Sequence, residues 1–91
     1  MLFVALLKEH SGTVRERVDR RVKWAYPEGM QVVAEYWLQT PDPGVILVCK
    51  ADHISQFWAL GAAWGDVFDI AVFPAITAED GLELLKQMIP D

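Results

Sequence analysis

The sequence predicts an α+β fold in which strands and helices follow in the order β-α-β-β-α-β, with one further helix at the end. Two observations predict it. Apolar runs typical of strands alternate with segments whose apolar residues recur at helical spacing. Two of the expected strands are joined by a short connection rich in proline, which favours an antiparallel hairpin in the middle of the pattern. We expect one domain, residues 1–91.

The first half of the pattern is a strand followed by an amphipathic helix. Residues 2–7 form a continuous apolar run that predicts a buried strand. Thr13 and Glu16 have the spacing of a capping box, so a helix begins there. It ends near Tyr26, because Pro27 disfavours helical geometry at the residue before it. The apolar stripe of this helix consists of Val14, Val18, Val22 and Ala25.

The second half contains the hairpin, a second helix, the last strand and a terminal helix. We expect strands over 30–39 and 44–50, and a helix over 53–64 that is capped by Asp52. The last strand runs over 67–73, and the terminal helix follows Thr77 with a stripe of Leu82, Leu85, Met88 and Ile89. This order is the split βαβ, or ferredoxin-like, pattern.

Composition excludes several classes of protein. The net charge of −5 disfavours general nucleic-acid binding, because an acidic chain repels phosphates. Apolar runs are all much shorter than the roughly 20 residues that span a bilayer, so we expect no membrane segment. The apolar N-terminal run lacks the basic flank of a signal peptide, which favours a cytoplasmic protein. The single cysteine, Cys49, has no partner for an internal disulfide.

Strand periodicity divides the sheet into two faces. If the hairpin loop is 40–43, Ala34 lies opposite Cys49 and Glu35 lies opposite Val48. The uncharged face would lie under the helices, with Cys49 buried and inert. The other face is mostly apolar, and an exposed apolar face of this size is unusual in a monomer. We therefore expect a homodimer with two sheets face to face. The predicted open face carries Val33, Glu35, Trp37, Ile46, Val48, Lys50, Val67, Asp69, Ala71 and Phe73.

Three segments resemble an uncharacterised family of small prokaryotic domains. They are Glu35-Tyr36-Trp37, the apolar strand 44–50, and Trp64-Gly65-Asp66-Val67-Phe68-Asp69-Ile70 leading to Pro74-Ala75. The resemblance covers residues 1–76 and implies a ferredoxin-like fold assembled as a dimeric α/β barrel. It brings no assigned activity. The wider group of dimeric barrels includes cofactor-free monooxygenases, haem-degrading enzymes, lactone isomerases and ligand-sensing domains.

Carboxylates on the predicted open face are the first candidate site residues. Glu35 is costly on an apolar surface unless it is paired, so it is either a ligand-binding or basic group or the partner of Lys50. Asp69 shares that face, but in the strand order 4-1-3-2 it lies on the opposite edge, about 14 Å from Glu35. Asp69 then is a solvated rim carboxylate unless a second subunit brings the two together.

The remaining candidates are aromatic and imidazole side chains. Trp37 could line an aromatic pocket together with other tryptophans, or anchor the core or an interface. His10 lies at an element boundary, where acid/base chemistry and plain solvent exposure are both open. We expect no metal site, since the histidines lack ligand spacing, and no cofactor. The basic cluster of the first helix is either a solvated face or a docking surface for an anion or protein: Arg15, Arg17, Arg20, Arg21 and Lys23.

The leading functional prediction is a small-molecule binding or sensing module, with catalytic residues unassigned. Its candidate ligand-binding residues are Glu35, Trp37, Lys50, Asp69 and His10. Two other classes stay open at this point. One is a cofactor-free enzyme of the monooxygenase or isomerase type, and the other is a structural or protein-interaction domain.

Overall fold

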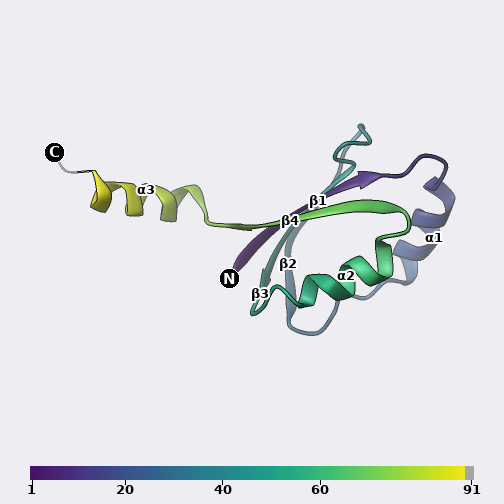
Figure 1. The fold of residues 1–91 in the computed structure, drawn as a ribbon, viewed down its shortest axis with the longest axis horizontal. Helices are drawn as coiled ribbons and strands as arrows, with labels where there is room; N and C mark the ends of the chain where they lie inside the picture. Colours follow the sequence, from purple (N-terminus) through teal and green to yellow (C-terminus); the bar gives the residue numbers. More distant parts are fainter. Residues whose placement is uncertain (90–91) are drawn as a thin grey trace.

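The computed structural model describes residues 1–89 and contains one four-stranded antiparallel sheet with helices α1 and α2 on the same face (Figure 1). The sheet order is β2-β3-β1-β4, so the fold is α+β and ferredoxin-like, as predicted. The strands are β1 (Leu2–Glu9), β2 (Met30–Trp37), β3 (Val45–Ala51) and β4 (Phe68–Ala75). The helices are α1 (Val14–Lys23), α2 (Gln56–Trp64) and α3 (Ala78–Met88).

The core lies between the sheet and α2. This helix buries Phe57, Leu60 and Trp64, while Trp58 on its outer side is 75% exposed. The ring of Phe57 packs 5.1 Å from that of Phe3. Full burial of each large apolar side chain contributes about 2 kcal/mol to folding, so α2 is held mainly by this row of contacts. The sheet contributes Phe3, Ala5, Leu7, Met30, Leu47, Cys49, Ala51 and Phe68.

A β-bulge in β2 overturns part of the predicted register. The pairing shifts between Val32, which lies opposite Cys49, and Ala34, which lies opposite Val48. The extra residue, Val33, exchanges the faces of everything after it, because side chains alternate along a strand. Glu35 therefore pairs with Leu47 on the face that the helices cover, and Trp37 lies on that face too. The predicted placement of Glu35 and Trp37 on the open face was wrong.

Helix α1 presents arginines to the core, which its apolar stripe did not suggest. An amphipathic pattern favours valines against the sheet, yet no residue of α1 is buried and Val22 is 80% exposed. The guanidinium groups lie over aromatic rings from β4, from α2 and from the segment that follows α1. The distances from guanidinium to ring centre are 5.5 Å for Arg17 and Phe68, 5.3 Å for Arg20 and Trp64, and 5.6 Å for Arg21 and Tyr26. Cation–π attraction and the long aliphatic stems thus replace valine packing.

Helix ends agree with the sequence at one helix and differ at two. The Thr77 hydroxyl accepts a hydrogen bond from the backbone amide of Asp80, as expected for α3. Helix α1 ends at Lys23 and lacks the predicted capping box. The Thr13 hydroxyl instead donates to the carbonyl of His10. Helix α2 begins at Gln56 with Ser55 as its N-cap, three residues after the predicted cap at Asp52.

Helix α3 leaves the sheet and points away from it, as Figure 1 shows on the left. None of its residues is buried. The opposite face of the sheet from α1 and α2 carries no helix, so its apolar side chains are uncovered among residues 1–89. No helix in this part of the chain is long and apolar enough to cross a membrane.

Candidate functional site

A pocket of about 160 Å³ lies beneath α1, between that helix and the centre of the sheet. It exists because α1 is held off the sheet by arginines rather than by close packing of valines. Its floor is formed by Leu7, Leu47 and Val45 of β1 and β3. Its walls are mostly aromatic and aliphatic side chains, namely Val18, Trp24, Tyr26, Trp37, Leu38, Leu60, Trp64 and Phe68.

Glu35 is the central polar group of this pocket, and its carboxylate is fully engaged. Arg21 donates to both oxygens, from Nε at 3.1 Å and from Nη2 at 3.0 Å. The Tyr26 hydroxyl donates to Oε1, and Trp37 Nε1 donates to Oε2 at 2.7 Å. The Glu35 side chain is only 15% exposed. A partly buried carboxylate with four donors is stable in its charged form.

The hydrogen bonds determine how these groups titrate. Burial of the Glu35 carboxyl raises its pKa, but the donors Arg21, Tyr26 and Trp37 and the charge of Arg21 outweigh burial, so the pKa lies below its ordinary value. Burial raises the pKa of Tyr26 well above its usual range, and the hydrogen bond to Glu35 adds to this. Near neutral pH the pocket thus holds an ionised glutamate and a neutral tyrosine.

A second ion pair lies at the other end of the pocket. Arg17 Nη1 lies 3.0 Å from Oε1 of Glu9, and both residues line the pocket. Gly44 lies against the Glu9 side chain so closely that a Cβ atom at this position would collide with the carboxylate. Glycine at position 44 therefore permits the Glu9–Arg17 pair. Both acidic groups of the pocket are neutralised by an arginine of α1.

The structure separates the five residues that the sequence offered as one site. Glu35 and Trp37 lie together in the pocket. His10 and Asp69 form a separate pair, with His10 Nε2 lying 2.8 Å from Oδ1 of Asp69. Lys50 lies on the open face, opposite Gln31 and Leu2, and pairs with neither Glu35 nor Asp69. The expected partnership of Glu35 with Lys50 was wrong, and the partner is an arginine of α1.

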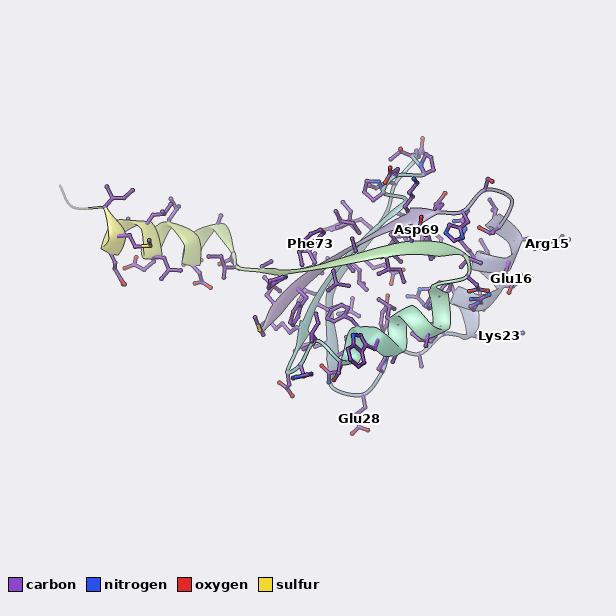
Figure 2. All side chains as sticks on the ribbon, viewed as in Figure 1. Arg15, Glu16, Lys23, Glu28, Asp69 and Phe73 are labelled. Carbon is purple, nitrogen blue, oxygen red and sulfur yellow. The ribbon has the colours of Figure 1, made fainter. Side chains whose placement is uncertain are left out.

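The His10 pair ties the end of β1 to the connection between α2 and β4. His10 Nδ1 lies 3.0 Å from the carbonyl oxygen of Asp66, and Nε2 faces Asp69. Because both ring nitrogens face acceptors, the arrangement favours the protonated ring. The hydrogen bond to Asp69 and then that to the Asp66 carbonyl raise the pKa of His10. Figure 2 places Asp69 toward the α1 end of β4.

Other sites with recognisable chemistry are not formed by the described residues. Within residues 1–89 no three histidine, cysteine, aspartate or glutamate side chains gather as metal ligands. Cys49 is completely buried, and burial raises the pKa of its thiol to about 11, with a smaller contribution from the charge of Glu35. It is therefore a protonated core residue at neutral pH, in agreement with the prediction from strand alternation.

Several pocket residues were not predicted from the sequence. The sequence pattern places Arg21 in a general basic cluster and Tyr26 at the end of the first helix. One signal was present, since two aromatic residues, Trp24 and Tyr26, lie between the basic helix and Pro27. Trp24 is partly buried and lies edge-on to Tyr26 and Trp64, and its buried Nε1 has no hydrogen-bond partner among residues 1–89.

Comparison with protein families identifies the chain's relatives. Residues 1–89 match the family model described as Domain of unknown function (DUF3303). The chain belongs to the DUF3303 family. The match includes α3, so it extends beyond residues 1–76, where the resemblance was recognised. No curated protein and no solved structure matches the chain. DUF3303 has no assigned activity, so the function of the pocket is argued from its geometry.

Proposed function

We propose that this DUF3303 chain is a small-molecule binding or sensing module whose ligand occupies the pocket beneath α1. The observation that carries this proposal is an apolar pocket of about 160 Å³ surrounding a carboxylate that is already neutralised. An apolar cavity of about 150 Å³ in another protein admits benzene, so this pocket has room for a ligand of about one ring.

The charges of the pocket support an uncharged ligand. Arg21 is engaged by Glu35 and Arg17 by Glu9, so neither cation is free to bind an anionic group. A charged ligand would have to break one of these pairs or enter without a counter-ion, and both are costly in an apolar site. A compact neutral molecule with one hydrogen-bonding group at the polar end fits best.

The same features disfavour a cofactor-free enzyme, the main alternative. A general base works best when its pKa lies near the working pH. Glu35 accepts four hydrogen bonds, and its pKa lies below the ordinary value, so it is a weak base. His10 is engaged through both ring nitrogens and lies outside the pocket lining. The available groups are therefore better suited to holding a ligand than to moving a proton.

The proposed oligomeric state and cellular location rest on the sequence arguments given above. We propose a cytoplasmic homodimer of the α/β barrel type in which the open sheet faces are buried. Support comes from the uncovered face itself, where apolar residues of all four strands lie side by side: Leu2, Val4, Leu6, Ala34, Tyr36, Ile46, Val48, Ala71 and Phe73.

The ligand proposal is tested with ring-sized neutral probes such as phenol, benzyl alcohol and cyclohexanone. A probe present at about 100 times its Kd stabilises a single site by about 2.7 kcal/mol, which raises the Tm of a domain this small by roughly 10–20 °C. We expect at least one probe to do so, with one-to-one binding by calorimetry.

Two variants of α1 locate the binding site. Val18→Phe places a ring in the pocket lining and is expected to abolish the stabilisation by probes. Val22→Phe is the matched control, since Val22 lies one turn further on, is more exposed and does not line the pocket. If no probe binds, or if Val18→Phe binds as well as the unchanged chain, the ligand proposal is wrong.

A further inference from the structure

The described chain exposes more surface than a compact protein of its size. A folded monomer of 10.3 kDa exposes about 5,400 Å², whereas this chain exposes 6497 Å². Its radius of gyration is 15.5 Å, against about 12 Å for a compact domain of 91 residues. The surplus of about 1,100 Å² exceeds the roughly 800 Å² that each partner buries in a standard interface.

Two apolar surfaces contribute to this exposure, and they belong to different parts of the chain. One is the stripe of α3, centred on Leu85, which is 51% exposed and faces none of its own sheet. The other is the open face of the sheet, where Phe73 is 50% exposed. A hollow runs from the open face to the start of α3; its lining is mostly apolar, including Leu2, Val33, Val48, Pro74 and Ile76, with Lys50 and Asp80 as its charged residues.

The connection to α3 keeps the helix away from its own open face. Only Ile76 and Thr77 separate β4 from α3, and Thr77 has extended backbone angles. The helix therefore continues in the direction of β4, beyond the end of the sheet (Figure 1). In this conformation the stripe is displayed to a neighbouring molecule.

We propose that α3 is an exchanged arm that packs its apolar stripe on the open sheet face of a second copy of this chain. Two-fold symmetry makes the contact reciprocal, so each copy supplies one arm and one face. Helix α3 has 11 residues and is about 16 Å long, which fits across four strands spaced about 4.8 Å apart. Within the proposed homodimer the arm takes the place of the direct sheet-on-sheet contact of a barrel, and the inference does not depend on the ligand.

Single substitutions on the two surfaces test the arm. Leu85→Glu puts a charge in the centre of the stripe, and Phe73→Lys does the same on the open face. Each is expected to weaken dimerisation by roughly 100-fold or more, because a charge would be buried without a partner. Glu83→Gln, on the opposite side of α3, and Val22→Lys, on the exposed stripe of α1, are the matched controls and should dimerise like the unchanged chain. Sedimentation at micromolar concentration measures all five proteins.

Mixing separates exchange from other arrangements. A mixture of Leu85→Glu and Phe73→Lys chains should form heterodimers. The unchanged arm of the Phe73→Lys chain would pack on the unchanged face of the Leu85→Glu chain, and in the second contact the new glutamate would lie against the new lysine. Leu85→Glu lies outside the core, so circular dichroism should show an unchanged fold.

Four results would overturn the arm. The first is that the unchanged chain is a monomer. The second is that the Leu85→Glu variant dimerises normally, which would indicate a dimer formed by the sheet faces alone. The mixture fails to associate, which indicates that α3 folds back on its own sheet. Val22→Lys dissociates while Phe73→Lys does not, which moves the contact to α1.

Discussion

Arg21 donates two hydrogen bonds to Glu35, from Nε at 3.1 Å and from Nη2 at 3.0 Å from the carboxylate oxygens. This fork joins α1 to β2 across the pocket. A planar guanidinium matches a carboxylate in this way, and an ammonium group cannot. The contact fixes the height of α1 above the sheet and so defines the space in which a ligand would bind.

Removing the charge of Glu35 is expected to destabilise the fold. Glu35→Gln leaves Arg21 without its bidentate partner in a half-buried position, so the free energy of unfolding should fall by about 2 kcal/mol. A double-mutant cycle with Arg21→Met, measured by urea denaturation, should give a coupling of at least about 1 kcal/mol. Lys50→Met is the control, since Lys50 lies on the other face, and it should change stability by less than about 0.5 kcal/mol. Coupling of Glu35 with Lys50 instead of Arg21 would show that the bulge is misplaced.

Arginines of α1 should differ strongly in their importance for stability. Arg20 lies over Trp64, donates to the Ala63 carbonyl and pairs with Asp66 and Glu16. Arg20→Ala is therefore expected to lower the Tm clearly, whereas Arg15→Ala, a change at an exposed residue of the same helix (Figure 2), should leave the Tm almost unchanged. Thermal unfolding measures both. Equal losses would argue that α1 is stabilised by helix propensity and not by these contacts.

Both predictions concern contacts that the sequence did not reveal, in contrast to other parts of the fold. Element order and the burial of Cys49 follow from periodicity, which reports burial directly, whereas the strand order follows from the ferredoxin-like pattern. The sheet faces on which Glu35 and Trp37 lie could not be predicted, because the bulge at Val33 reverses the alternation of side chains along β2. No proline or glycine at this point of the sequence indicates the bulge. The arginine face of α1 was missed because helical periodicity treats arginine as a solvent residue. Its long stem and flat cation can instead cover aromatic rings.

The His10–Asp69 pair should give stability a dependence on pH. The pKa of folded His10 lies above the ordinary value of 6.5, because first the Asp69 carboxylate and then the Asp66 carbonyl accept hydrogen bonds from its ring. Its stabilisation is therefore complete below about pH 6.5 and is lost as the pH rises through the raised folded value. The unfolding midpoints of the unchanged chain and of Asp69→Asn should converge as the pH rises from about 6.5 through the raised pKa of folded His10. A constant difference between the two proteins would mean that the pair contributes nothing as an ion pair.

Cys49 should behave as an unreactive thiol. Burial raises its pKa to about 11, and the residue is fully covered by α2 and the sheet, so little thiolate is accessible in the native state. A thiol reagent at about pH 8 should label it at the rate of unfolding, and rapidly once denaturant is added. Rapid labelling of the native protein would place Cys49 on the open face and contradict the register of β3.

The central claim, that the pocket beneath α1 binds a ring-sized neutral ligand, is tested most directly by the indole signals of the four tryptophans. Trp24, Trp37 and Trp64 line the pocket, whereas Trp58 lies on the outer side of α2 and is 75% exposed. In a ¹H–¹⁵N correlation spectrum, titration with the best-binding probe should shift the three pocket signals along one binding curve and leave Trp58 in place. Shifts confined to Trp58, or no shift at saturating probe, would contradict the account.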